Sequence, residues 1–207
     1  MPDNAVRKKV ILIRHARIGA NDAGVYAGRR TDVSLTEEGA RKAEAAKDHI
    51  RRLAGDAAVF SGPMKRVRET ARILFDDRMI EIEDELTEID FGDFEGRSYD
   101  ELENDPRFQA WIDSGGMMTF PGGEGVSEFC ERSIRGLHNI IHRAKNAPNV
   151  AVVCHGGNIM AIMSRLTGEE YFKHIVGNLE GYILTFDWDN ERISAVAYDR
   201  ITCGSPA

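Results

Sequence analysis

The sequence predicts an α/β protein, specifically a three-layer α/β/α sandwich in which helices cover both faces of a mainly parallel sheet. Two observations lead to this expectation. Short continuous apolar runs, typical of strands that are buried on both faces, recur along the 207 residues. Between them lie longer segments whose apolar residues recur at helical spacing. Because no change in composition divides the chain, we expect one domain over residues 1–207.

The first half of the chain alternates between these two patterns. The apolar run at 10–13 predicts the first strand, and the aperiodic residues 14–34 predict a loop. Thr36 is a suitable N-cap for a helix that continues to about Gly55. The remaining elements of this half are a strand at 57–60, a helix at 64–75 and a strand at 79–82.

The second half begins with helical structure and closes with strands. Ser98 and Glu101 have the spacing of a capping box, which predicts helical structure through Trp111. Glycine and proline residues mark a loop over 115–123, and an amphipathic pattern predicts a helix over 126–145. The elements that follow are a buried strand at 150–154, a helix ending near Gly168, and a hairpin with strands at 182–188 and 193–198 around a turn at 189–192.

Composition and charge argue against several classes of protein. The formal net charge of −7 disfavours nucleic acid and anionic membranes as partners. The apolar run at 10–13 is too short for a signal peptide or a membrane span, so we expect a cytoplasmic protein. Cys130, Cys154 and Cys203 lack the spacing of a disulfide framework or a zinc site, and no cofactor is expected. The sequence leaves the oligomeric state open, a homodimer included.

Two of the predicted strands end in loops that carry a histidine. His15 follows the run at 10–13, separated from it by Arg14, and His155 follows the run at 150–154. Because ligands in open α/β sheets bind at the carboxyl ends of the strands, we expect both histidines to face one crevice. The loop after the strand at 57–60 delivers Arg66 on the first turn of a helix.

These residue types suit phosphoryl transfer. A neutral imidazole is a competent nucleophile near neutral pH. Guanidinium groups bind phosphate oxygens in pairs and offset their charge in the transition state. A carboxylic acid is then needed to protonate the leaving oxygen. The backbone N–H groups of Gly156 and Gly157, at the start of a helix, supply further donors to an anion.

Six blocks of sequence, in order over roughly residues 10–165, resemble the histidine phosphatase (phosphoglycerate mutase-like) superfamily. A single tripeptide such as Arg-His-Ala would carry little weight, but six ordered blocks are hard to obtain by chance. The blocks are Arg14-His15-Ala16 with Asn21, then 35–39 (LTEEG), 61–71 (SGPMKRVRETA), 86–96 (LTEIDFGDFEG), 121–124 (PGGE) and 154–157 (CHGG). The resemblance implies a phosphoglycerate mutase-like fold and an enzyme that needs no metal.

The resemblance also implies a role for each matching residue. His15 would accept the phosphoryl group, and Glu88 would act first as general acid and then as the base that activates water. The phosphate pocket would be formed by Arg14, Arg66 and His155. The substrate-binding residues expected beside it are Asn21, Arg17, Gly28 and Gly156.

Some positions depart from the pattern or leave an alternative. Arg17 stands where many relatives have a glutamate, which favours a more anionic substrate. Asp90 is the alternative acid to Glu88, and Arg68 is the alternative phosphate ligand to Arg66.

We therefore expect hydrolysis of a small phosphorylated metabolite through a phosphohistidine on His15. One alternative is a phosphoglycerate mutase, but mutases usually carry extra basic residues after the region of Glu88, and residues 96–121 include only Arg97 and Arg107 as cations. The other alternative is a phosphate-binding module without catalysis. Such modules normally lose the nucleophile or a pocket arginine, and this chain retains both.

Overall fold

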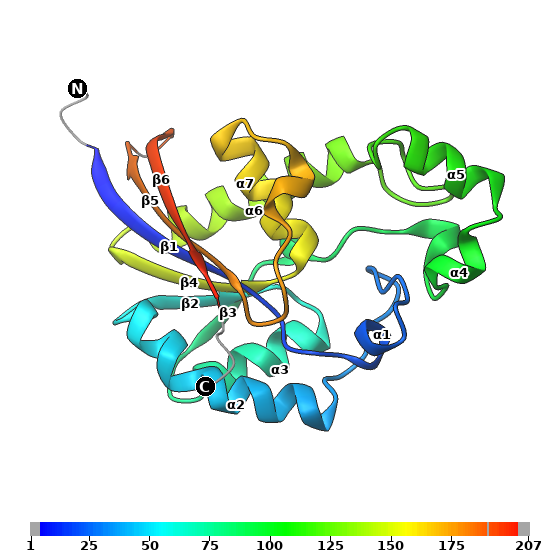
Figure 1. Cartoon of the computed structure of the whole chain (residues 1–207). Coiled ribbons are helices and arrows are strands. Elements are labelled where there is room, and N and C mark those ends of the chain that lie inside the picture. Colours follow the sequence, from blue (N-terminus) through cyan, green and yellow to red (C-terminus); the bar gives the residue numbers. More distant parts are fainter. Residues whose placement is uncertain (1–4, 190, 203–207) are drawn as a thin grey trace.

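The computed structural model describes residues 5–189 and 191–202 and confirms the α/β class (Figure 1). Six strands form one sheet in the order β3-β2-β4-β1-β5-β6. The strands are β1 (Val6–Arg14), β2 (Ala58–Ser61), β3 (Ile80–Ile82), β4 (Asn149–Cys154), β5 (Gly181–Trp188) and β6 (Ile193–Ile201). The four strands from β3 to β1 are parallel, and β5 and β6 extend the sheet antiparallel, so the sheet is mainly parallel as predicted. Asn190 of the predicted turn and Cys203 lie outside the described residues.

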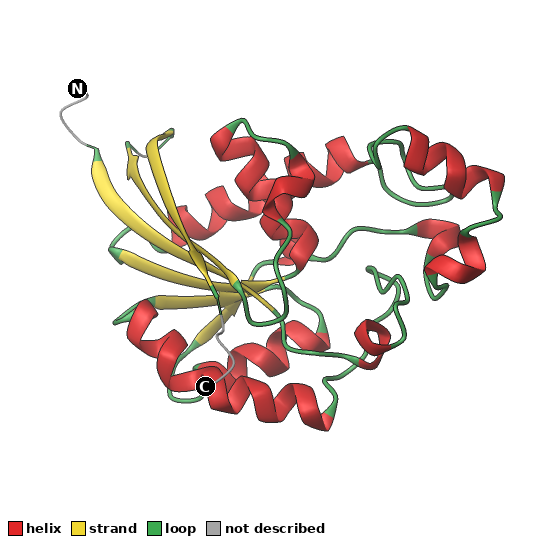
Figure 2. Cartoon of the chain, in the orientation of Figure 1, coloured by secondary structure: helices red, strands yellow, loops and turns green. Residues whose placement is uncertain are grey.

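Helices cover both faces of this sheet and complete the three layers (Figure 2). On one face lie α2 (Glu37–Ala54) and α3 (Lys65–Leu74), and on the other lie α6 (Val126–Arg143) and α7 (Gly156–Thr167). The shorter helices are α1 (Gly19–Asp22), α4 (Tyr99–Leu102) and α5 (Pro106–Asp113), with 3₁₀ turns η1 (Asp84–Leu86), η2 (Gly92–Phe94) and η3 (Tyr171–His174). No helix among the described residues combines the length and the apolar character that crossing a membrane requires.

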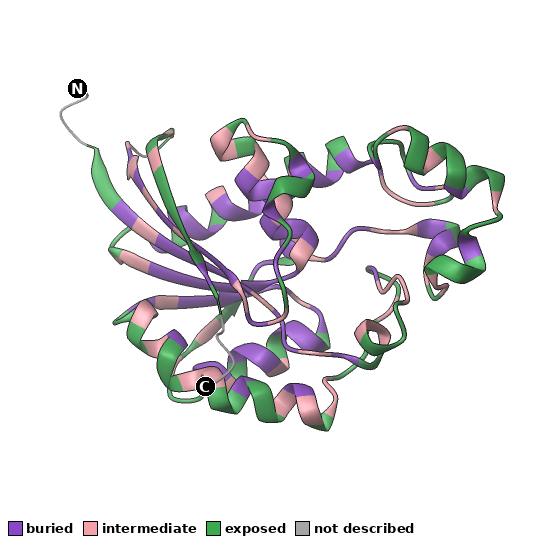
Figure 3. Cartoon of the chain, viewed as in Figure 1, coloured by how far each residue is buried: buried purple, intermediate pink, exposed green. Residues whose placement is uncertain are grey.

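The central strands are buried because both of their faces pack against helices (Figure 3). Successive side chains of a strand point to opposite faces, so Val10 and Leu12 of β1 pack towards α6 and α7. Ile11 and Ile13 pack towards α2 and α3. This explains why β1 and β4 are continuous apolar runs rather than alternating ones.

The helix boundaries follow the predicted signals, with two corrections, the first being that the predicted loop at 14–34 contains the short helix α1. Thr36 caps α2 by accepting a hydrogen bond from Gly39 N at 2.9 Å, and Gly168 ends α7 in the left-handed conformation. The expectation of continuous helical structure from Ser98 to Trp111 is wrong, because α4 ends at Leu102 and α5 begins at Pro106. A proline disfavours helical backbone at the preceding residue, so the chain starts a new helix there.

The segment between β3 and α6 extends beyond the carboxyl ends of the strands and carries α4 and α5 (Figure 1). A third apolar cluster joins this segment to α6 and α7. Its aromatic members include Phe94, Phe108, Phe120 and Phe129. The segment therefore forms a wall over the edge of the sheet at which β1 and β4 end.

Lys8 of β1 connects the sheet to the end of α6. Its side chain is only 2% exposed, and its ammonium group donates to the carbonyl oxygens of Ala144 (3.1 Å), Lys145 (2.7 Å) and Ala147 (2.7 Å). These carbonyl groups belong to the C-cap of α6 and to the turn that follows it, where the end of the helix carries partial negative charge. A buried cation at this position is favoured by that charge and donates to the three carbonyl groups.

Replacing Lys8 with methionine should destabilise the fold, because it removes the side-chain donor from the part-buried carbonyl groups of Lys145 and Ala147 and one of two donors from that of Ala144. We expect Lys8→Met to lower the free energy of unfolding in urea by about 2 kcal/mol. Arg7→Met is the matched control, since Arg7 is an exposed neighbour that pairs with Asp187 at the surface. Equal stability of the two variants would contradict the capping role of Lys8.

Candidate active site

The two predicted histidines lie side by side because β1 and β4 are parallel neighbours in register. Arg14 pairs with Cys154 at the ends of these strands, and His15 N donates to Cys154 O at 2.9 Å. The rings of His15 and His155 consequently meet edge to face, with 5.2 Å between their centroids. Both residues are buried.

His15 is held in the tautomer that leaves Nε2 free. Its Nδ1 lies 2.7 Å from the carbonyl oxygen of Ala16, and a carbonyl can only accept, so Nδ1 carries the proton. Burial, together with the positive charges of Arg66 and Arg14, lowers the pKa of His15 to about 3. The imidazole is therefore neutral at physiological pH, with an unshared electron pair on Nε2.

Arg14 and Arg66 flank this ring, and each leaves its Nε buried without a hydrogen-bond partner among the described residues. Arg66 is fully buried, and its guanidinium donates to the carbonyl oxygens of Thr31 (2.6 Å) and Gly28 (3.3 Å). Arg14 donates from Nη1 to Val176 O at 2.7 Å. Arg68, the alternative to Arg66, is exposed on α3.

His155 is the N-cap of α7 and is fully buried. Neither of its ring nitrogens has a hydrogen-bond partner in the described part of the chain. Burial and the neighbouring positive charges lower the pKa of His155 well below its ordinary value, so the ring is neutral and carries one N–H. Buried donors are rarely left unpaired in proteins, so His155, Arg14 and Arg66 together call for a ligand rich in acceptor oxygens.

Glu88 is the carboxyl group of this site. Its Oε2 lies 3.9 Å from Nδ1 of His155, and its Oε1 accepts from Ile89 N at 3.0 Å. Burial raises the pKa of Glu88, although the Ile89 N–H and the charges of Arg66 and Arg14 act in the opposite direction. A Cβ at Gly157 would lie 2.3 Å from Oε1, so any larger residue there would displace the Glu88 carboxyl group.

The alternative acid, Asp90, is engaged elsewhere. Its carboxylate accepts from Gly92 N at 2.9 Å and pairs with Arg30 at 2.9 Å. These contacts hold the loop that follows Glu88, and they direct the Asp90 carboxylate towards a different set of partners from that of Glu88.

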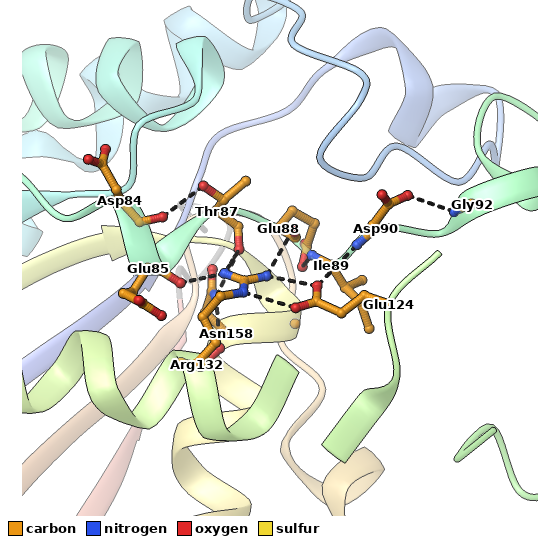
Figure 4. Close-up of polar contacts among 12 residues, drawn as sticks. Asp84, Glu85, Thr87, Glu88, Ile89, Asp90, Gly92, Glu124, Arg132 and Asn158 are labelled. Carbon is orange, nitrogen blue, oxygen red and sulfur yellow. Dashed lines mark hydrogen bonds and ion pairs between the residues drawn. The ribbon is translucent and has the colours of Figure 1, made fainter. Parts of the chain in front are cut away.

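Arg132 of α6 fixes the segment that carries Glu88 (Figure 4). Its guanidinium donates to the carbonyl oxygens of Glu85 (2.5 Å) and Thr87 (2.9 Å) and forms a two-point pair with the carboxylate of Glu124 (3.0 and 2.9 Å). A planar guanidinium suits such forked contacts better than any other side chain. Arg132 thus joins three separate stretches of chain beneath Glu88.

Asn158 of α7 adds a second link to the same segment. Its amide donates to Thr87 O at 3.3 Å and to Ser133 Oγ at 3.0 Å, while its oxygen accepts from His155 N at 3.2 Å. The loop with Glu88 and the start of α7 with His155 are therefore positioned by one side chain.

The predicted substrate-binding residues have different surroundings. Asn21 accepts from Ile18 N at 3.1 Å and lies 3.4 Å from Nδ2 of Asn178, which donates to His15 O at 2.9 Å. A Cβ built on Gly156 would lie 3.4 Å from Nε of Arg14, so this glycine is a neighbour of the Arg14 side chain. The structure brings both close to His15 or Arg14.

The other two predicted substrate-binding residues, Gly28 and Arg17, make contacts of a different kind. Gly28 accepts from Arg66 and packs so closely on Ile89 that a Cβ would lie 2.4 Å from that carbonyl oxygen. It therefore holds Arg66 in place. The guanidinium of Arg17 forms an ion pair with Asp22, which offsets its charge. A substrate contact for either residue stays a prediction.

Thr70 and Asn178 are supporting residues to which the sequence analysis assigned no role. Thr70 Oγ accepts from Ala16 N at 2.9 Å and donates to Arg66 O at 2.7 Å, joining the His15 loop to α3. Thr70 lies inside the block at 61–71, so a signal for it was present. Asn178 and Arg132 lie outside any recognised block, and no spacing in the sequence marks them.

In the described part of the chain, the site shows no arrangement of metal ligands. Among the described residues, no group of three His, Cys, Asp or Glu side chains is arranged to hold a metal ion.

Comparison with known proteins supplies a family. The model of the "Histidine phosphatase superfamily (branch 1)" matches residues 10–199. A metal-independent phosphoserine phosphatase of Arabidopsis thaliana is 31% identical over 166 residues, which cover 77% of this chain and 68% of that protein. A bifunctional protein of Mycobacterium tuberculosis is 35% identical over 153 residues, covering 71% of this chain. The match spans only 41% of the length of that bifunctional protein.

A solved structure supports the fold. The mycobacterial glucosyl-3-phosphoglycerate phosphatase, in a complex with VO3, superposes with a TM-score of 0.81 and covers 93% of this chain and 97% of its own. At 21% identity, this likeness concerns the fold alone.

Removing Arg132 should destabilise the protein, because the part-buried Glu124 carboxylate would lose its two-point partner and the Glu85 carbonyl would lose its donor, while Thr87 O would keep only Asn158. We expect Arg132→Met to lower the free energy of unfolding by about 3 kcal/mol in urea denaturation. Arg135→Met is the matched control on the same helix, since Arg135 is exposed and pairs with Glu85 at the surface. If Arg132→Met were as stable as the wild type, the contacts of Arg132 would not hold these segments together.

Proposed function

This chain belongs to the histidine phosphatase superfamily, and on that premise we propose that it hydrolyses phosphomonoesters through a phosphohistidine formed on His15. One observation carries the proposal. The free Nε2 of a neutral His15 is surrounded by buried donors of Arg14, Arg66 and His155 that have no partner among the described residues. A phosphate group would provide acceptor oxygens for all of them, and guanidinium groups are suited to bind them in pairs.

In the first step, the electron pair of His15 Nε2 attacks phosphorus and the bond to the ester oxygen breaks. The ring gains positive charge, which the Ala16 carbonyl stabilises through the hydrogen bond from Nδ1. Arg14, Arg66 and His155 offset the charge on the phosphoryl oxygens. Glu88 donates its proton to the leaving oxygen, so the product is a neutral alcohol.

Glu88 is suited to this donation by its surroundings. Burial raises its pKa in the free protein, and a phosphate dianion beside it would raise that pKa further through like-charge repulsion. The carboxyl group is therefore protonated more readily than an exposed glutamate when the substrate binds.

In the second step, a water molecule attacks the phosphohistidine. Glu88, now a carboxylate, takes one proton from the water as its oxygen bonds to phosphorus and the P–N bond breaks. The electron pair returns to Nε2, and the proton returns Glu88 to its starting state. The cycle consumes one ester and one water and releases one alcohol and one phosphate, with no metal in either step.

A mutase is the weaker candidate because it must hold a carboxylate next to the transferred group. The two cations of residues 96–121 are engaged with carboxylates, Arg97 with Asp105 at 3.5 Å and Arg107 with Asp93 at 2.7 Å and Asp105 at 2.9 Å. A binding module without catalysis is also weaker, because a free Nε2 on a neutral His15 and a carboxyl of raised pKa are features that binding alone does not require. The proposed substrate is a small phosphorylated metabolite, and the proposed location is the cytoplasm.

Hydrolysis of p-nitrophenyl phosphate in the presence of a chelator tests the reaction. We expect metal-independent release of nitrophenol, and a loss of more than about 10³-fold in kcat for His15→Ala because the nucleophile is gone. His49→Ala is the matched control, since His49 is exposed on α2 and outside the site. If the phosphohistidine intermediate is to be trapped, the reaction must be quenched with alkali, because its P–N bond survives alkali and not acid. A wild type as inactive as His15→Ala would refute the proposal.

The role of Glu88 predicts a pH dependence that differs between substrates. An alkyl phosphate needs the protonated carboxyl group, so its kcat/KM should fall as pH rises through the elevated pKa of Glu88. Nitrophenolate leaves without a proton, so that ester should lose less. Glu88→Gln should reduce kcat/KM by about 10²–10⁴-fold for the alkyl ester and by far less for the nitrophenyl ester. Equal losses for both esters would contradict the assignment.

A further inference from the structure

A cavity of about 290 Å³ opens beside the proposed phosphate pocket. Arg14, Glu88 and the two glycines Gly156 and Gly157 line its inner end. The remainder of the wall is mostly apolar, and its aromatic members are Tyr26, Phe91, Trp111, Phe120, Tyr171 and Phe172. Because the ester oxygen must lie next to Glu88, the group attached to that oxygen would extend into this cavity.

We propose that the preferred substrates are phosphate esters of an apolar alcohol that carries an aromatic ring system of about two rings, and that esters with a carboxylate on the leaving group are disfavoured. This inference rests on the proposed hydrolysis and adds the chemical class of the leaving group. The charge, the size and the mouth of the cavity each support it.

The charge of the cavity wall argues against an anionic leaving group. Among the residues that line the cavity, Arg14 is the only Lys or Arg, and its guanidinium is shared between Val176 O and the phosphate pocket. Two arginines of the N-terminal loop carry carboxylate partners, Arg17 with Asp22 and Arg30 with Asp90. A carboxylate in this cavity would lose its water without gaining a cation, and it would lie near Glu88. The expectation that Arg17 favours a more anionic substrate therefore finds no support in its surroundings.

The size and shape of the cavity suit flat rings. An apolar cavity of about 150 Å³ can hold a benzene molecule, so 290 Å³ accommodates a two-ring group. The wall is built from aromatic side chains that support one another, with ring centroids 5.1 Å apart for Tyr26–Phe91 and for Phe91–Phe120 and 5.0 Å apart for Trp111–Phe120. Aromatic walls of this kind favour ring substrates beyond the area they bury.

The mouth of the cavity is apolar as well. Phe172 and Ile175 line it while remaining 41% and 56% exposed, and Met117 and Met118, which follow the lining residue Gly116, are each 50% exposed. Apolar side chains grouped at a surface opening are a feature of ligand-binding sites, and methionine adapts its shape to varied apolar ligands. An apolar leaving group would cover this rim.

A series of esters with primary alcohols tests the inference, because it keeps the leaving-group chemistry similar while changing charge and shape. We expect kcat/KM for naphthylethyl phosphate to exceed that for phosphoserine, and for phosphoglycerate carrying its phosphate on the primary hydroxyl, at least tenfold. A preference for either carboxylate ester would overturn the leaving-group inference while leaving hydrolysis intact. Failure to hydrolyse any ester, p-nitrophenyl phosphate included, would instead refute the proposed function on which the inference rests.

A charge placed at the mouth provides the second test. Ile175→Arg should lower the ratio of kcat/KM for naphthylethyl phosphate to that for phosphoserine at least tenfold, because it adds the missing cation and removes apolar contact. The inhibition constant of inorganic phosphate should change little in this variant, because the phosphate pocket is not altered. Met79→Arg is the matched control, with the same change on a side chain that is 85% exposed and outside the cavity. An unchanged ratio in Ile175→Arg, or an equal change in Met79→Arg, would overturn the inference.

Discussion

The parallel pairing of β1 with β4 is the contact on which the rest of the site depends. Because this register sets Arg14 opposite Cys154, the next residues, His15 and His155, leave the sheet side by side, and a backbone hydrogen bond joins the two loops. The same pairing extends to β2, where Ser61 lies opposite Val153 and leads into the helix with Arg66. A shift of one residue in any of these strands would exchange its two buried faces and turn these groups away from one another.

Burial then sets the protonation of the side chains that this pairing gathers. It lowers the pKa of His15 and raises that of Glu88, so that the nucleophile is neutral and the acid tends to keep its proton. The two arginines reinforce the first effect and oppose the second. These perturbed groups persist because neighbouring side chains hold the segments that carry them: Arg132 and Asn158 hold the segment of Glu88, while Thr70 joins the His15 loop to Arg66.

The two ends of the site are built by different parts of the chain. The sheet and the starts of α3 and α7 supply the polar end, with its converging donors. Much of the apolar end comes from the segment between β3 and α6, together with residues that follow α7. This division allows the groups around phosphorus to stay fixed while the wall around the leaving group varies, as expected when function is carried by segments placed on a rigid scaffold.

The sequence by itself determined the six strands and the four long helices, the two histidines at the strand ends and the family, because these follow from local periodicity, capping residues and motif order, but it missed α1 and the break between α4 and α5. It also placed Arg66 and Glu88 within their blocks, but it could not separate them from Arg68 and Asp90 by physical argument. Only the tertiary structure decided that Arg66 is buried while Arg68 is exposed, and that Asp90 turns to Arg30. It alone revealed Asn178, Arg132 and the apolar cavity. The reason is that burial and pairing are set by neighbours from distant parts of the chain, and no spacing along the sequence encodes which of those neighbours meet.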